Sequence, residues 1–208
     1  MRFSLLAGRY EDPDLDAEML PSDGEKRLAD RGTTYVAVAN GLVVITGVAT
    51  LRPGMFAALP GGWLVQLTGA RALAVHVKHY TSMLLAGGPI EPIGRLRYID
   101  GCSDTGLLGP LKRGDPCLNH LHFPPGITQT LHTHPSVRIG MIMRGIGQCI
   151  GPVESPLRTG DVFVIPTGAV HGFATSKDKM MDIIAFHPDS IVGPTDEHHQ
   201  MLDATIPA

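Results

Sequence analysis

The stretch GITQTLHTHPSVRIGMIMRGIG, residues 126–147, decides both the fold and the site of this chain. It contains two histidines, His132 and His134, separated by one residue. On an extended strand alternate residues point to the same face, so these two imidazoles are expected side by side. Arg138 has the same parity and is expected on that face as well. The pattern favours a polar site on one face of a β-structure.

A second stretch, GDVFVIPTGAVHGF from residue 160, supplies a third histidine. His171 lies 37 residues after His134 and follows Pro166 and Gly168, a strand–turn–strand pattern. Two imidazoles from one strand and one from a neighbouring strand could form one face of a metal site, with other positions open to water or substrate. Neutral imidazole suits Fe, Zn, Cu, Ni or Mn. The alternative is an ordinary surface or core pair of histidines at residues 132 and 134.

Together the two stretches resemble the paired motifs of the cupin superfamily. In the first motif five residues follow the glycine, three follow the second histidine, and six precede the closing glycine; its marked positions are Gly126, His132, His134, Arg138 and Gly145. In the second motif the marked positions are Gly160, Pro166, Gly168 and His171. Fourteen residues separate the two motifs. The resemblance covers residues 117–187 directly and 33–80 more weakly.

The resemblance implies an all-β fold, a double-stranded β-helix or jelly-roll barrel with its site in the mouth. It also implies that His132, His134 and His171 hold a divalent metal ion. The superfamily includes dioxygenases, decarboxylases, isomerases, lyases, storage proteins and ligand sensors, so the fold does not settle the function.

Arg138 departs from the family pattern, which usually has a ligating Glu at this position. A guanidinium is always protonated and has no lone pair to give to a cation. In this respect the chain resembles the three-His iron cupins. If Arg138 points into the barrel, it can form a two-pronged hydrogen bond to a substrate carboxylate. The alternative is that it turns to the rim or pairs with a local acid.

Two further polar residues are candidates for contact with a substrate. His122 precedes the first motif; if it points inward it could bind substrate, donate or accept a proton, or act as a fourth ligand. A rim or surface position is the alternative. Gln129 lies three residues before His132 and could reach the ion or a bound ligand.

An internal similarity predicts a second β lobe. The segment GMFAALPGGWLVQLTG from Gly54 repeats the glycine, proline and glycine spacing of the second motif, but Val65 replaces the histidine. We therefore expect residues 1–95 to contain a degenerate, metal-free cupin-like lobe with strands over 33–85. Residues 96–208 would form the metal-binding cupin domain.

Composition supports the β interpretation and excludes several classes. The chain has 208 residues, of which 43% are hydrophobic and 18% are charged, with 25 Gly and 17 Pro. The low charge argues against disorder and coiled coil, and the frequent Gly and Pro are typical of many short strands rather than a helical bundle. A net charge of -3 without a basic block gives no footprint of nucleic-acid binding.

We expect a cytoplasmic protein with no membrane segment. Gly32–Leu51 is an uncharged run of twenty residues, long enough to span a bilayer. However, the dipeptide Asn40-Gly41 divides it and predicts a hairpin turn. Cys102, Cys117 and Cys149 are odd in number and have no CxxC spacing, which favours a reducing compartment.

These observations lead to one leading function and two alternatives. The leading hypothesis is a metal-dependent cupin enzyme, an Fe(II) dioxygenase acting on a small anionic or chelating substrate, in which Arg138 orients the anion. Zn, Ni, Mn or Cu are other candidate metals. The alternatives are a metal-dependent lyase or isomerase, and a non-catalytic ligand sensor with a structural metal. We expect a homodimer, because exposed sheet edges are commonly covered by a partner.

Overall fold

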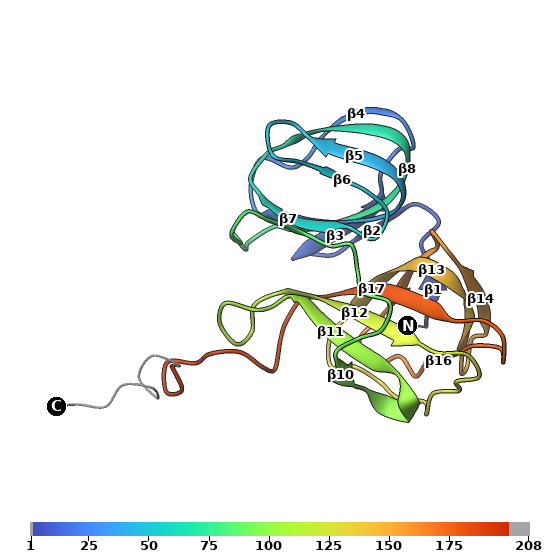
Figure 1. Cartoon of the computed structure of the whole chain (residues 1–208). Coiled ribbons are helices and arrows are strands. Elements are labelled where there is room, and N and C mark those ends of the chain that lie inside the picture. The colour runs from blue at the N-terminus through green and yellow to red at the C-terminus, as the bar shows by residue number, and fades with distance from the viewer. Residues whose placement is uncertain (1, 200–208) are drawn as a thin grey trace.

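The computed structural model describes residues 2–199, which form seventeen strands in two antiparallel sheets (Figure 1). Among these residues the single helical element is a 3-10 turn at Ile99–Gly101. The all-β expectation is confirmed. No helix within residues 2–199 is long and apolar enough to cross a membrane.

The first sheet contains eight strands from the first half of the chain. Its main path runs β2-β3-β8-β5-β7-β9, with β4 paired to β8 and β6 paired to β5. The strands are β2 (Arg9–Glu11), β3 (Leu15–Met19), β4 (Gly24–Arg27), β5 (Thr33–Ile45), β6 (Ala49–Leu51), β7 (Phe56–Pro60), β8 (Leu64–Val77) and β9 (Leu85–Gly87). The five strands from residue 33 onward are those that the internal similarity predicts.

The second sheet contains nine strands and carries both sequence motifs. Its main path runs β1-β15-β13-β17-β12-β11-β10, with β14 and β16 paired to β13. The strands are β1 (Ser4–Leu5), β10 (Leu96–Arg97), β11 (Ser103–Leu108), β12 (Cys117–Phe123), β13 (Arg138–Ile150), β14 (Ser155–Arg158), β15 (Val162–Ile165), β16 (Gly172–Ala174) and β17 (Met181–His187). Since β1 pairs with β15, the first residues of the chain are hydrogen-bonded to the second lobe. The domain boundary at residues 95 and 96 stays a prediction.

The hairpin turn expected at Asn40-Gly41 is wrong. β5 continues through this dipeptide, and the register against β8 shifts on either side of Asn40, as in a β-bulge. Gly41 has a φ of +70°, and a Cβ there would lie 2.1 Å from the carbonyl oxygen of Gly69. The left-handed backbone that usually makes a tight turn here makes a bulge, because the long β8 strand offers pairing to both halves of β5.

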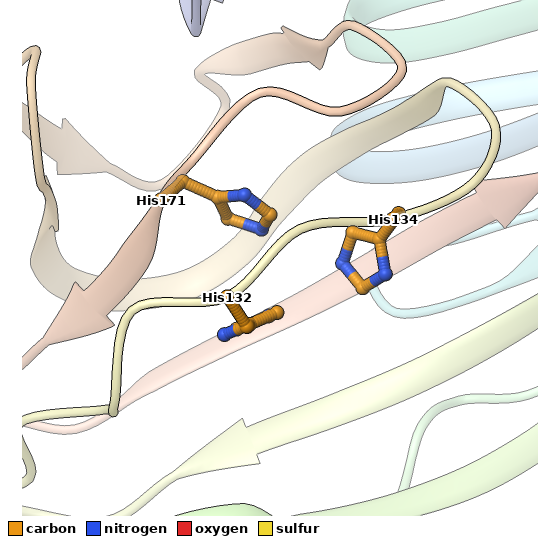
Figure 2. Close-up of side chains that lie close together, drawn as sticks. All are labelled: His132, His134 and His171. Atoms are coloured by element: carbon orange, nitrogen blue, oxygen red, sulfur yellow. The ribbon is translucent and has the colours of Figure 1, made fainter.

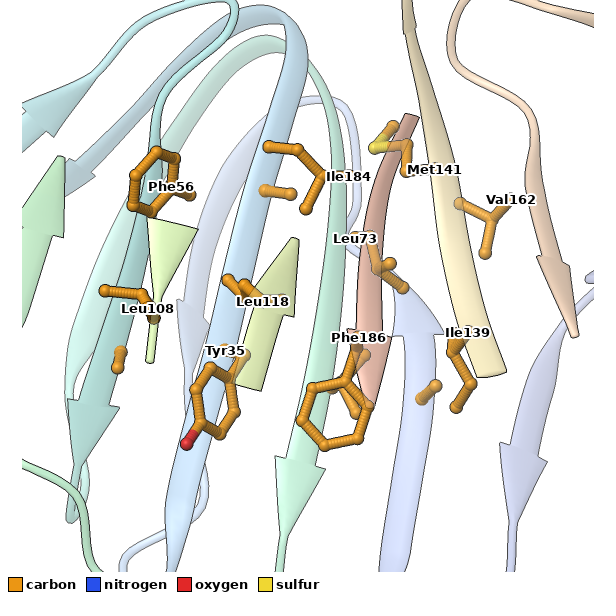
Figure 3. Packing of buried hydrophobic residues seen from close by; sticks show 14 of the residues in the cluster. Tyr35, Phe56, Leu73, Leu108, Leu118, Ile139, Met141, Val162, Ile184 and Phe186 are labelled. Atoms are coloured by element: carbon orange, nitrogen blue, oxygen red, sulfur yellow. The ribbon is translucent and has the colours of Figure 1, made fainter. Parts of the chain in front are cut away.

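Each lobe has its own apolar interior, and a third core joins the two lobes. In β5, Val36 and Val38 face the interior of the first lobe. The alternate residues Tyr35, Ala37 and Ala39 face the second sheet. Figure 3 shows this shared core, in which side chains of the first lobe such as Tyr35 pack against side chains of the second such as Phe186. The rings of Tyr35 and Phe186 lie 5.2 Å apart. This shared core fixes one face of the second barrel and leaves its mouth free.

Candidate metal centre

Three histidines gather at the mouth of the second barrel (Figure 2). His132 and His134 lie on the extended segment between β12 and β13, and His171 immediately precedes β16. The backbones of His132 and His171 form an isolated β-bridge, with N–O distances of 2.9 and 3.0 Å. The amide of Gly168, in the turn before His171, donates to the carbonyl of His134 at 2.9 Å. These hydrogen bonds hold the two motif segments together. His132 and His134 therefore lie on a loop joined by one β-bridge, and not on the regular strand that their spacing predicts.

Backbone carbonyls orient two of the three imidazole rings. Nδ1 of His132 donates to the carbonyl of Thr130, and Nδ1 of His171 donates to the carbonyl of Ala169, both at 2.9 Å. Because a carbonyl only accepts, the proton of each neutral ring lies on Nδ1 and the lone pair lies on Nε2. This arrangement presents Nε2 as a metal ligand.

The histidine nitrogens form a compact donor set. The ligand atoms of His132, His134 and His171 lie within 4.8 Å of one another, and the ring centroids are 4.6 to 5.1 Å apart. Nε2 of His171 is buried and has no hydrogen-bond partner. A buried polar atom without a partner is costly, and a metal ion would satisfy it. The residues present therefore fit a divalent metal bound by three neutral imidazoles.

Burial keeps the imidazoles of His134 and His171 neutral. It lowers the pKa of His134 to about 3, and the positive charge of Arg138 and the neighbouring imidazoles of His171 and His132 lower it further. Burial also lowers the pKa of His171 to about 4. Metal ligation needs the unprotonated ring, so the environment favours the ligating form at neutral pH.

A cavity of about 80 Å³ opens beside the three histidines. Its lining includes aliphatic and aromatic side chains, among them Leu121, Ile165, Phe163 and Phe173. It also includes five polar residues, Tyr98, Asp104, Gln129, Arg138 and His187. The mouth of the barrel thus combines the three histidines with apolar and polar lining residues.

Arg138 is the first residue of β13 and lies in the cavity wall, 9% exposed. Its Nη1 donates to the carbonyl of Val137 at 3.1 Å and to Ser136, and lies 3.6 Å from a carboxylate oxygen of Asp189. The Arg138 side chain therefore lines the cavity and also pairs with a local acid, Asp189. Nε is buried without a partner. The guanidinium edge formed by Nε and Nη2 remains for a ligand.

Gln129 also lines the cavity, but its amide is used within the protein. Its Oε1 accepts from the backbone amide of Phe173 at 3.2 Å, and its Nε2 donates to the sulfur of Cys102 at 3.7 Å. The side chain is 3% exposed. This geometry ties the segment before His132 to β16, and the expected contact with a ligand stays a prediction.

His122 does not point into the cavity. On β12 the residues that line the cavity are Leu121 and Phe123, so His122 and His120 face the opposite side. Both imidazoles bond to the same carboxylate oxygen of Asp182, at 2.8 Å. The inward orientation on which its proposed role depended is therefore wrong.

Asp182 anchors this outer network. Burial alone would raise the pKa of Asp182, but hydrogen bonds from His120, Arg144 and His122 outweigh it and lower the pKa. Arg144 also donates to the carbonyl of Glu91 at 2.8 Å, which fastens the segment between the lobes to the second sheet. The network is structural and separate from the histidine cluster.

His187 is a site residue that sequence reasoning missed. It ends β17 and lines the cavity with Ala185, two residues earlier on the same face. Burial lowers the pKa of His187 to about 3, and the charges of Arg138 and His134 contribute. Its position as a polar residue at the end of the apolar strand MDIIAFH was the available signal. Tyr98 and Asp104 lie in segments whose sequence carries no comparable signal.

Comparisons with known proteins agree with this geometry. The sequence profile of the cupin domain family matches residues 119–187. No curated protein matches the chain in sequence. Among solved structures, a cupin 2 conserved barrel domain protein from Leptotrichia buccalis is similar, with a TM-score of 0.62 and 15% identity over 90% of this chain and 89% of that one.

Structures of differing function share the fold. Salicylate 1,2-dioxygenase from Pseudoaminobacter salicylatoxidans, in complex with gentisate, has a TM-score of 0.58 and 13% identity, covering 85% of this chain and 69% of that one. An 11S globulin from Wrightia tinctoria, reported with an auxin binding site, has a TM-score of 0.52 and 10% identity, covering 90% and 84%. At such identities the likeness concerns the fold. The domain profile over residues 119–187 and the shared barrel of the similar structures agree that this part of the chain has the cupin fold.

Proposed function

We propose that this protein is a metal-dependent cupin enzyme, an Fe(II) dioxygenase that acts on a small anionic or chelating substrate. One observation carries the proposal. Three neutral imidazoles converge beside a cavity, and one of them presents a buried Nε2 without a partner. A site of three neutral ligands leaves the charge of a divalent ion uncompensated, so it favours an anionic substrate.

The residues of the chain divide the work at this site. When bound, Fe(II) would supply the chemistry that brings dioxygen and substrate to react as neighbours. His132, His134 and His171 would hold the ion. Arg138 would bind the anion through the guanidinium edge formed by Nε and Nη2. The apolar side chains that line the cavity would exclude water.

The similar structure of salicylate 1,2-dioxygenase supports the oxidative assignment as an analogy. The similar 11S globulin, reported with an auxin binding site, supports the second candidate, a non-catalytic ligand-binding cupin. A lyase or isomerase that uses the metal as a Lewis acid is the remaining alternative. The three candidates differ in their combination of metal, oxygen uptake and substrate turnover.

Elemental analysis of protein purified without a metal-affinity column distinguishes them, followed by oxygen-electrode measurements with candidate substrates. Stoichiometric iron with substrate-dependent oxygen uptake is the expected result. Zinc with substrate turnover but no oxygen uptake would favour the lyase or isomerase. Tightly bound zinc without turnover would favour the sensor.

We further propose that the protein forms a homodimer. β9 and β10 end the two sheets, and Leu85 and Leu96 on these edge strands are 40% and 65% exposed. Unpaired edges with apolar side chains favour association. Light scattering at micromolar concentration tests this, and a monomeric mass would contradict it.

A further inference from the structure

We infer that the cavity selects short-chain 2-oxo or 2-hydroxy carboxylates, of about two to four carbons, and rejects aromatic carboxylates. This inference rests on the proposed function, because it concerns the same metal site. It goes further by naming the substrate class from the size and lining of the cavity.

The size of the cavity limits the ligand. Its volume is about 80 Å³, and a bound metal would take part of it. A cavity of about 150 Å³ is known to accept benzene in another protein. The space beside the histidines is therefore smaller than a cavity that encloses an aromatic ring, whereas a short aliphatic acid fits within it.

The aromatic side chains that line the cavity are tightly packed and cannot easily move. Phe123, Phe163 and Phe173 are between 0% and 4% exposed. Phe173 packs against each of the other two rings at a centroid distance of 5.4 Å. Interiors packed in this way resist the insertion of extra volume. The three rings therefore prevent the cavity from widening on their side.

Two unsatisfied nitrogens define the polarity of the ligand. Within residues 2–199, three buried side-chain nitrogens have no hydrogen-bond partner, and two of them belong to cavity-lining residues: Nε2 of His171 and Nε of Arg138. The first is a lone pair for a metal, and the second is a charged donor for an anion. A carboxylate with an adjacent oxo or hydroxyl oxygen satisfies both requirements in a few atoms.

Leu121 is the residue that most directly sets this limit. It is a partly buried aliphatic side chain on β12 that lines the cavity and packs at the edge of the core that contains the three phenylalanine rings. Leu118 lies on the same strand but faces the core between the lobes. The two leucines provide a matched pair, because truncation of either removes the same atoms and only the first enlarges the cavity.

The test measures binding to the full chain loaded anaerobically with Fe(II). A calorimetric Fe(II) titration comes first; absence of metal binding would overturn the proposed function and this inference together. Pyruvate and salicylate are then titrated into the loaded protein. We expect pyruvate to bind at least about tenfold more tightly. Equal or tighter binding of salicylate, or no binding of either acid, would overturn the size inference and leave the metal site standing.

The variants locate the size limit. Leu121→Ala should lower the ratio of pyruvate affinity to salicylate affinity by about tenfold. Leu118→Ala should leave this ratio unchanged. If Leu121→Ala does not fold, Leu121→Val makes the same test with a smaller change. A ratio unchanged by substitution of Leu121 in folded protein, or changed equally by substitution of Leu118, would contradict the role of Leu121.

Discussion

The two lobes share a strand–turn–strand spacing, but within residues 2–199 the three-histidine cluster lies only in the second. In the first lobe, Thr34 of β5 pairs with Leu59 of β7; in the second, Arg138 of β13 pairs with Ile165 of β15. Both pairs stand at the same distance from the proline of the turn that follows. Thr34 thus occupies the position of Arg138, and the framework tolerates either residue.

The interiors differ at the position of His171. Val65 occupies this position in the first lobe and is 0% exposed within an aliphatic cluster. In the second lobe the imidazole of His171 lies with those of His132 and His134 beside a cavity. The comparison shows that turns and strand pairing build the barrel, whereas a few interior positions decide whether the barrel has chemistry.

The volume of a hollow does not identify the candidate site in this protein. The first lobe has a larger hollow, about 200 Å³, lined by charged side chains. These charges satisfy one another: Asp16 pairs with Arg9 at 2.9 Å, and Glu18 pairs with Lys26 at 3.0 Å. The second lobe instead leaves nitrogens unpaired. The unsatisfied polar atoms, rather than the volume, distinguish the lobe for which we propose a ligand site.

The largest expected effect concerns the histidine that the first lobe lacks. His171→Ala should weaken metal binding by more than about 100-fold, beyond the usual loss for a residue that only supports a ligand. The barrel should still fold, since the apolar cores remain. Metal titration by calorimetry, with circular dichroism to verify folding, makes the measurement. Val65→Ala is the matched control in the first lobe and should retain full stoichiometry.

Acid should destabilise the second lobe before the first. In the folded, metal-free protein burial lowers the pKa of His134 and His187 to about 3 and that of His171 to about 4, against 6.5 when unfolded. The unfolded chain therefore binds more protons, and the free energy of unfolding falls as pH falls from 6.5 to about 4, by up to ~1.4 kcal/mol per pH unit for each histidine. In the first lobe, burial lowers the pKa of one histidine, His76.

Hydrogen exchange at pH 7 and pH 5 can compare the two lobes. Protection in β13 and β17 should fall more than protection in β5 and β8. Added metal should restore it, because ligated imidazoles do not bind protons. Equal losses in both sheets would show that the buried histidines do not control acid stability.

Removal of a buried leucine in the first lobe should affect stability without affecting the site. Leu59→Ala truncates a fully buried side chain and should lower the free energy of unfolding by about 2 to 5 kcal/mol. Metal stoichiometry should stay unchanged. Urea unfolding makes the measurement, and Leu85→Ala, on the edge strand β9, is the control with a much smaller expected loss.

The smallest effect is expected for the conservative substitution of Arg138. Arg138→Lys keeps the charge but loses the planar fork, so pyruvate binding should weaken by about tenfold while metal binding stays unchanged. Arg138→Glu should tighten metal binding and abolish anion binding. Arg158→Lys, with an exposed side chain, serves as the control. If both substitutions at Arg138 leave both affinities unchanged, the guanidinium does not take part in the site.

The sequence by itself determined the all-β architecture and the three-histidine cluster. Frequent glycine and proline between apolar runs predict short strands, and the spacing of His132, His134 and His171 predicts their convergence. These features are local, because turn chemistry and strand parity depend on residues near one another in the chain. The same local logic predicted a hairpin at Asn40-Gly41, where pairing with a distant strand produced a bulge.

Only the tertiary structure decided which polar residues face the cavity. His122 lies on the outer face because Asp182, sixty residues away, lies beside it there. His187 enters the cavity because β17 pairs with β12 and β13. Arg138 divides its contacts between a local acid and the cavity wall for the same reason. Partners distant in sequence are joined only by the register of the folded sheets, so neither composition nor spacing within a motif can reveal them.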